Sequence, residues 1–271
     1  MLASLVTVLA LTLASAPPSP QDPSTPSCRS FNSQTACGYG CKTDSNRAQC
    51  AKTPQGRCQV VDGQAVCFDP PAYVVKAYGD ALPEVQCKAI DGVVACGYNC
   101  VTQPGRVKCA KSPAGVCRAL AGEVQCFDPP AVVFAVYGKE TPRADCRTNS
   151  LELACGYNCQ NTSEGVRCSK TPMGVCKAAN GRLTCFDPSP AALCAWKRAL
   201  PAPECRNGES GPVCGYACTT AFSKSGCAST PAGVCKVFDS EVACFDPPVE
   251  QKADAECLAS LGLAALDGAT P

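Results

Sequence analysis

The segment Cys58–Cys67 reads CQVVDGQAVC and has the pattern of a short β-hairpin closed by its two cysteines. Asp62-Gly63 at its centre favours a two-residue type I′ turn, because both turn positions need a positive φ. Counting outward from this turn places Cys58 opposite Cys67 on a non-hydrogen-bonded pair, where the Cα atoms come close enough for a disulfide. The sequence therefore predicts this bridge and its equivalents, Cys117–Cys126, Cys176–Cys185 and Cys235–Cys244.

The hairpin belongs to a unit that occurs four times at a constant offset along the chain, beginning at Cys28, Cys87, Cys146 and Cys205. Each unit contains six cysteines with the spacing C-x8-C-x3-C-x8-C-x7-C-x8-C, and no insertion interrupts any copy. Identical spacing in four copies indicates a tandem-repeat architecture. The cysteine-bearing core of each unit is too short to bury a large apolar core, so we expect three disulfides per unit.

The predicted fold class is small, disulfide-rich β: four tandem six-cysteine hairpin or meander modules joined by short helical linkers. The repeats span 28–69, 87–128, 146–187 and 205–246, and the linkers between them span 70–86, 129–145 and 188–204. We expect a signal peptide at 1–16, a Pro/Ser-rich linker at 17–27 and a helical tail at 247–271.

The pairing of the first four cysteines in each repeat stays open at this point. They could pair first with second and third with fourth, or cross, because six cysteines allow fifteen connectivities. Metal binding is the alternative to disulfides, but zinc sites usually show paired C-x2-C knuckles and this spacing has none. We therefore expect no metal site.

Three further motifs recur in step with the cysteines. A Gly-Tyr pair follows the second cysteine, a Pro-x-Gly precedes the fifth, and Phe-Asp-Pro closes each repeat. We expect the tyrosine to pack on the bridges and the glycine to permit a turn. We expect Asp69 and its equivalents to cap a helix rather than to bind a cation.

The linkers have the pattern of short helices. Asp69-Pro70-Pro71 resembles a helix start, an apolar run follows, and Gly79 is a natural stop. An aromatic residue recurs in register at Tyr78, Tyr137 and Trp196. This favours one or two helical turns that dock between modules in a semi-rigid rod; the alternative is a plain linker.

Composition excludes several classes of function. The chain has 271 residues with 26 cysteines, no histidine and a net charge of +1. Without histidine there is no Ser-His-Asp or Cys-His catalysis, and a near-neutral chain has no general attraction for nucleic acid. The motifs that recur with the cysteines are present in all four repeats, whereas catalytic sites are usually singular. We therefore predict no enzyme activity, no cofactor and no nucleic-acid partner.

The N-terminus predicts export. Residues 2–14 are apolar or small, the stretch is too short to span a bilayer comfortably, and Ala14-Ser15-Ala16 is a small-x-small cleavage pattern. Cleavage after Ala16 would leave a secreted, extracellular or periplasmic protein without a membrane segment, in a compartment that permits disulfides. An uncleaved anchor is the alternative, since no basic residue precedes the apolar stretch.

One loop resembles the reactive loop of Bowman–Birk serine-protease inhibitors. It is the C-x7-C segment Cys50–Cys58, in which Lys52 precedes Thr53. The resemblance implies that Lys52, Lys111 and Lys170 would enter a trypsin-like pocket. The segment departs from the family by its Pro54 and, in repeat 4, by Ser229 in place of lysine, and it competes with the Cys58–Cys67 pairing.

Over residues 28–248 the pattern CGYxC…TPxGxC…CFDPP resembles exported bacterial cysteine-rich tandem-repeat proteins that mostly lack an assigned function. The resemblance implies secretion and disulfides but no activity. The leading hypothesis is a secreted, non-catalytic structural or binding scaffold with an unknown extracellular protein or matrix partner. The alternative is a multi-headed protease inhibitor.

Two cysteines fall outside the repeats. Cys194 lies in the third linker and Cys257 in the tail, on either side of repeat 4. A bridge between them would fold a tail helix, expected to end near Gly268, back onto the third linker and cap the array. The alternative is a bridge between chains at one or both positions.

Overall fold

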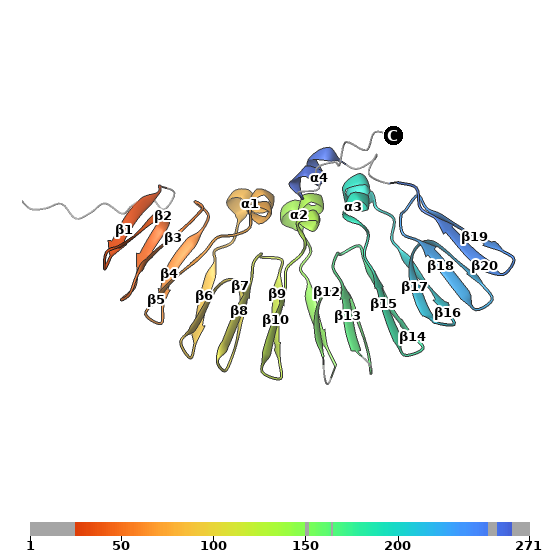
Figure 1. Cartoon of the computed structure of the whole chain (residues 1–271), viewed down its shortest axis with the longest axis horizontal. Helices are drawn as coiled ribbons and strands as arrows, with labels where there is room; N and C mark the ends of the chain where they lie inside the picture. The colour runs from red at the N-terminus through yellow and green to blue at the C-terminus, as the bar shows by residue number, and fades with distance from the viewer. Residues whose placement is uncertain (1–24, 150–151, 164, 249–253, 262–271) are drawn as a thin grey trace, which may run out of the picture.

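The computed structural model describes residues 25–149, 152–163, 165–248 and 254–261. Within these ranges the chain forms a curved row of narrow antiparallel sheets (Figure 1). Short helices gather along one edge of the row, and the hairpin tips spread out at the opposite edge. The predicted signal peptide 1–16 lies outside the described residues.

Each repeat consists of a three-stranded meander followed by a two-stranded hairpin. The meanders use the first four cysteines and the hairpins the last two. The strands of the first two repeats are β1 (Ser27–Phe31), β2 (Gln34–Thr43), β3 (Ala48–Ala51), β4 (Arg57–Val61), β5 (Gln64–Phe68), β6 (Gln86–Ile90), β7 (Val93–Gln103), β8 (Arg106–Ala110), β9 (Val116–Leu120) and β10 (Glu123–Phe127). Those of the last two are β11 (Asp145–Thr148), β12 (Leu153–Thr162), β13 (Gly165–Ser169), β14 (Val175–Ala179), β15 (Arg182–Phe186), β16 (Glu204–Gly208), β17 (Gly211–Ala221), β18 (Lys224–Ala228), β19 (Val234–Phe238) and β20 (Glu241–Phe245).

Disulfides join neighbouring cysteines throughout the repeats. All 26 cysteines are paired in thirteen bridges, and twelve of these close a hairpin whose cysteines are nine positions apart. In repeat 1 the pairs are Cys28–Cys37, Cys41–Cys50 and Cys58–Cys67. The pairing that the sequence left open is therefore sequential, first with second and third with fourth.

The last hairpin of each repeat has the register that its turn predicts. Val61 lies opposite Gln64 and Cys58 opposite Cys67, with the two cysteine Cα atoms 4.0 Å apart. Both turn residues have positive φ, as a type I′ turn requires. The weaker turn sequences adopt the same conformation: Ala121 and Gly122 in repeat 2, Asp239 and Ser240 in repeat 4.

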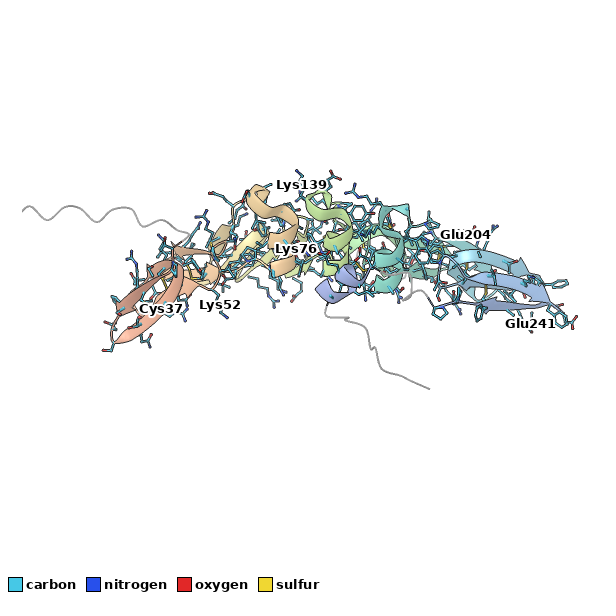
Figure 2. The ribbon with its side chains drawn as sticks, turned by 90° about the horizontal axis from the view of Figure 1, so that it is seen from above. Cys37, Lys52, Lys76, Lys139, Glu204 and Glu241 are labelled. Carbon is cyan, nitrogen blue, oxygen red and sulfur yellow. A yellow bond between two sulfur atoms is a disulfide. The ribbon has the colours of Figure 1, made fainter. Side chains whose placement is uncertain are left out.

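The sheets stack directly on one another along the row. Within repeat 1, β2 contacts β4 and β3 contacts β5, and β5 then contacts β7 of the next repeat. The same contacts recur between later repeats, where β10 meets β12 and β15 meets β17. The chain is therefore one continuous stack of hairpins rather than a rod of modules separated by linkers. From above, the stack is long and narrow, with Cys37 near one end and Glu241 near the other (Figure 2).

The three linkers are short helices that pack in a row: α1 (Ala72–Tyr78), α2 (Ala131–Tyr137) and α3 (Pro190–Trp196), each followed by a 3-10 turn. α1 contacts α2, and α2 contacts α3. The ring centroids of Tyr73 and Phe134 lie 5.3 Å apart across the first of these contacts. Gly79 and Gly138 are the C-caps of α1 and α2, and both have positive φ.

The expectation that Asp69 caps the following helix is wrong. The N-caps of α1 and α2 are Pro71 and Pro130, with no side-chain cap hydrogen bond, whereas the N-cap of α3, Ser189, accepts from a helix N–H through its side chain. Asp69 instead faces back into its own repeat, because its carboxylate finds backbone N–H donors there.

The tail forms a short helix, α4 (Ala255–Ser260), that lies over α2 and α3 (Figure 1). It ends at Ser260 with Leu261 as its C-cap, and the predicted helix end near Gly268 lies outside the described residues. In the described part of the chain, no helix is long and apolar enough to cross a membrane.

Candidate functional site

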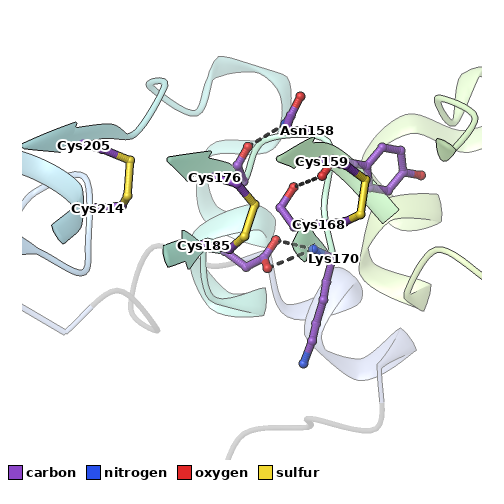
Figure 3. Close-up of a disulfide and its surroundings, with 12 residues drawn as sticks. Asn158, Cys159, Cys168, Lys170, Cys176, Cys185, Cys205 and Cys214 are labelled. Atoms are coloured by element: carbon purple, nitrogen blue, oxygen red, sulfur yellow. Dashed lines mark hydrogen bonds between the residues drawn. A yellow bond between two sulfur atoms is a disulfide. The ribbon is translucent and has the colours of Figure 1, made fainter. Parts of the chain in front are cut away.

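The most regular polar feature of the protein is a loop held by an aspartate. In repeat 3, both carboxylate oxygens of Asp187 accept from the backbone N–H of Lys170, at 2.8 and 2.9 Å. One of them also accepts from the backbone N–H and the hydroxyl of Thr171. Figure 3 shows this contact beside the Cys176–Cys185 bridge. Asp69 and Asp128 make the equivalent bonds, and Asp246 makes them through Oδ1 alone, so the loop has the same design in all four repeats.

The glycine of each Pro-x-Gly motif leaves room for this aspartate. A Cβ on Gly56 would lie 2.3 Å from Oδ1 of Asp69, which is far inside van der Waals contact. The Gly56 N–H also donates to the carbonyl of Thr53 at 3.0 Å and closes the turn. The shared geometry of the four loops thus depends on a glycine before the fifth cysteine and an aspartate after the sixth.

A second support comes from the residue after the Gly-Tyr pair. Asn99 has a φ of 48°, and its side-chain amide donates to the carbonyls of Pro113 and Gly115, at 3.1 and 2.7 Å. Asn158 repeats both bonds in repeat 3. Asparagine tolerates positive φ better than most residues, which suits it to this bulge in the strand. Repeats 1 and 4 have Gly40 and Ala217 at the same place.

The lysines of the candidate inhibitor loop are exposed. The side chains of Lys52, Lys111 and Lys170 extend into solvent, and Figure 3 shows Lys170 pointing away from the bridges. The loop lacks the closing disulfide on which its resemblance to Bowman–Birk inhibitors depends. Cys50 is bonded to Cys41 and Cys58 to Cys67. The lysine N–H groups are also occupied by the aspartates, so the segment is a clamped turn rather than an extended strand.

The tyrosine of the Gly-Tyr pair lies between repeats. Tyr98 is 4 % exposed and meets Phe68 of the preceding repeat edge-on, with ring centroids 5.9 Å apart. Tyr98 also packs with Cys96, Cys117 and Cys126, as expected for a ring that covers the bridges. The adjacent glycine does not form a turn, contrary to expectation. A Cβ on Gly97 would lie 2.5 Å from the carbonyl oxygen of Ala110, so glycine allows the two strands to approach closely.

Burial governs the chemistry of these tyrosines. It raises the pKa of Tyr98 and of Tyr216 to about 12, and it raises the pKa of Tyr157 well above its ordinary value. The Tyr157 hydroxyl donates to the carbonyl of Pro142 at 2.8 Å. The hydroxyls of Tyr98 and Tyr216 are buried without a hydrogen-bond partner. With their pKa values raised, these hydroxyls stay neutral and do not act as acids or bases near neutral pH.

The tail is attached to the helix row by a disulfide and two ion pairs. Cys194 of α3 is bonded to Cys257 of α4, with Cα atoms 5.7 Å apart. Lys197 lies 2.7 Å from Asp254, and Lys76 of α1 lies 3.2 Å from Glu256. This intramolecular arrangement matches the cap predicted from the two odd cysteines, but it reaches α1 and α2 as well as the third linker.

Lys197 takes an unfavourable conformation in this attachment. It has a φ of 49° at the place where the first two linkers have glycine. Its pKa is raised by the hydrogen bond to Asp254, and the pKa of Asp254 is lowered by the same contact. The third linker therefore has a lysine in place of glycine at the position that forms the ion pair with the tail.

The described residues contain no group of three or more His, Cys, Asp or Glu side chains placed to hold a metal ion. A groove with a volume of about 830 Å³ lies beside repeat 3, lined by Arg143, Arg147, Met173 and Leu200 among others. Comparison of the chain with protein-family models, with curated proteins and with solved structures gave no match.

Proposed function

We propose that this protein is a secreted, non-catalytic scaffold with a structural or binding role outside the cell. The observation that carries the proposal is that the recurring aspartates hold a loop within their own repeats. In repeats 1 to 3 both oxygens of the clamping aspartate accept from loop N–H groups, as at Asp128, and in repeat 4 one oxygen of Asp246 does so. Such groups are not free to act on a substrate.

The density of disulfides supports an extracellular role. Short hairpins bury little apolar surface, so covalent bridges must supply much of the support. Each bridge contributes on the order of 2–4 kcal/mol in a chain-entropy estimate. Disulfides at this density persist in oxidising compartments, and the signal-peptide pattern at 1–16 points to the same destination.

The scaffold is favoured over the protease inhibitor because of the loop geometry. An inhibitor of the Bowman–Birk kind presents its lysine on an extended, disulfide-closed loop. Here the Lys111 N–H is bonded to Asp128, and Pro113 removes another N–H that a protease would use.

The test expresses the full chain in a secreting host and has two readouts. We expect the oxidised protein in the medium, beginning at Pro17. We also expect no stoichiometric loss of trypsin activity when it is titrated at micromolar concentration. Retention in the reducing cytoplasm would contradict the extracellular role. Tight inhibition that is lost in Lys52→Ala, Lys111→Ala and Lys170→Ala together, and kept in the control Lys139→Ala, would establish the inhibitor instead.

A further inference from the structure

One contact between repeats occurs three times and joins the end of one repeat to the meander of the next. The pairs are Phe68–Tyr98, Phe127–Tyr157 and Phe186–Tyr216. Their ring centroids are 5.6 to 5.9 Å apart and the rings are nearly perpendicular. Edge-to-face pairs of this kind contribute about 0.5–1.5 kcal/mol beyond the area they bury.

A hydrogen bond accompanies two of these contacts. Arg118 donates to the carbonyl of Cys146 at 3.1 Å, and Lys177 donates to the carbonyl of Cys205 at 3.4 Å. In both cases a cation in the last hairpin reaches the first cysteine of the following repeat. An apolar ring and a cation thus form the rear face of a repeat, and a tyrosine and a carbonyl form its front face.

Repeat 4 carries the rear face without a following repeat. Phe245 is 65 % exposed, whereas Phe68, Phe127 and Phe186 are all partly buried. Lys236 stands at the position of Arg118 and Lys177 on this hairpin. Phe238 and Val234 on the same hairpin are 75 % and 54 % exposed. The described part of the tail does not cover this face, because α4 turns back to pack on α2 and α3.

Repeat 1 carries the front face without a preceding repeat. Tyr39 is only partly buried, whereas Tyr98, Tyr157 and Tyr216 are each buried. Cys28 is exposed, whereas its equivalent Cys146 is buried. The two unfilled faces lie at opposite ends of the stack, near Glu241 and near Cys37 in Figure 2.

We propose that copies of this chain associate head to tail, with the β19–β20 hairpin of one copy seated on the β1–β2–β3 meander of the next. Phe245 then meets Tyr39 of the second copy edge-on, and Lys236 donates to the carbonyl of its Cys28. The occupant is a second copy because the contact continues an interface that the chain already makes three times. The inference goes beyond the proposed scaffold function and stands without it.

The contact is heterologous, since different surfaces of the two copies meet. It therefore generates an open series of copies, or a ring if the curvature of Figure 1 closes. One hairpin-sized contact is smaller than the about 1,600 Å² of a standard stable complex, and no covalent linker holds the ends together. We therefore expect weak, concentration-dependent association.

Sedimentation velocity of the oxidised mature protein from low micromolar to high micromolar concentration tests the proposal. We expect the weight-average sedimentation coefficient to rise with concentration. Phe245→Asp should remove the rise, and Lys236→Glu should weaken association at least 10-fold. The control Phe222→Asp removes a more exposed ring, 89 % exposed, from the tip of the β17–β18 hairpin, and should change nothing. A wild-type coefficient that stays monomeric over the whole range would overturn the proposal, as would equal effects of Phe245→Asp and Phe222→Asp.

A photo-reactive phenylalanine at position 245 identifies what the rear face touches. We expect an intermolecular cross-link to the peptide that contains Tyr39. A cross-link to residues 17–24 or 262–271 of the same chain would show that the chain's own ends cover the face and would refute the head-to-tail contact.

Discussion

The ring of Phe186 meets the ring of Tyr216 edge-on, with centroids 5.6 Å apart and planes at 88°, and the two residues belong to different repeats. This contact explains how modules too small to form separate cores become one stable body. It also makes the stability of neighbouring repeats interdependent, as in other stacked repeat proteins.

Replacing Phe186 by alanine should loosen the junction between repeats 3 and 4. The change removes a packed aromatic ring, so we expect a loss of about 2–4 kcal/mol at that junction, because the cavity cannot fully collapse. This loss of stability is measured by guanidinium unfolding of the protein at submicromolar concentration with its disulfides intact. The matched control is Phe245→Ala, whose ring is largely exposed in a single copy. As a surface substitution it should change the free energy of unfolding by no more than about 0.5 kcal/mol. Equal losses in the two variants would refute the interdependence of the repeats.

The loop of repeat 4 should open in acid. Partial burial raises the pKa of Asp246, but hydrogen bonds from Ser229 and Thr230 outweigh this effect and leave the pKa below its ordinary value of 3.8. A lowered folded-state pKa means that the stabilisation is fully present above the unfolded value and is lost as pH falls through the folded value. Hydrogen exchange, corrected for intrinsic rates, should show the Ser229 and Thr230 amides protected at about pH 5 and exposed near pH 2. Asp246→Asn should abolish this pH dependence; persistence of it in the variant would assign it to another group.

The turn of the last hairpin offers a stabilising substitution. Ser240 has a φ of 68°, a conformation that costs little for glycine and more for serine. Ser240→Gly should raise the free energy of unfolding by about 0.5–1 kcal/mol, and the matched change Gly63→Ser in repeat 1 should lower it by a similar amount. Thermal unfolding of the oxidised variants compares the two. Shifts of the same sign would mean that turn conformation does not decide the stability of these hairpins.

Removing the Cys194–Cys257 bridge should release α4 from the helix row. The double change Cys194→Ser and Cys257→Ser leaves two exposed ion pairs and the packing of Leu258 and Leu261 to hold the tail. Exposed ion pairs contribute little, and the packed area of so short a helix is small. We expect at least 10-fold faster cleavage after Glu256 by a Glu-specific protease, with cleavage after the exposed Glu84 unchanged as internal reference. Unchanged cleavage after Glu256 would show that packing of Leu258 and its neighbours holds the tail without the bridge.

The repeat pattern and hairpin register could be predicted from the sequence because they depend on local chemistry. The type I′ turn at Asp62-Gly63 fixes which residues face each other, and the cysteines fall on a pair that a disulfide can join. The sequential pairing of the first four cysteines could not be predicted, because spacing alone permits crossed alternatives. The Cys194–Cys257 bridge could be predicted because these two cysteines are the ones left over when the four sets of six are paired.

The roles of Asp69 and of the Phe–Tyr pairs were missed for a different reason. Asp before Pro has the local pattern of a helix cap, and only the fold shows that its carboxylate reaches the N–H groups of Lys52 and Thr53, well upstream in the chain. Phe68 and Tyr98 lie in different repeats, so no local pattern connects them. Gly56 and Asp69 recur together in every repeat. This recurrence was the one signal that could have suggested that Asp69 contacts the loop containing Gly56.

Peptide mapping of the unreduced protein tests the central claim, that the chain is a continuous stack of sequentially bridged hairpins, most directly. Cleavage after Lys52 and Arg57 separates the second bridge of repeat 1 from the third. The structure predicts two peptides linked by Cys41–Cys50, one peptide with Cys58–Cys67 as an internal bridge, the equivalent pairs in every repeat, and Cys194–Cys257 from a monomeric band. A peptide linking Cys50 to Cys58 would contradict it, because that bridge closes the inhibitor-like loop and leaves the hairpins without their staples.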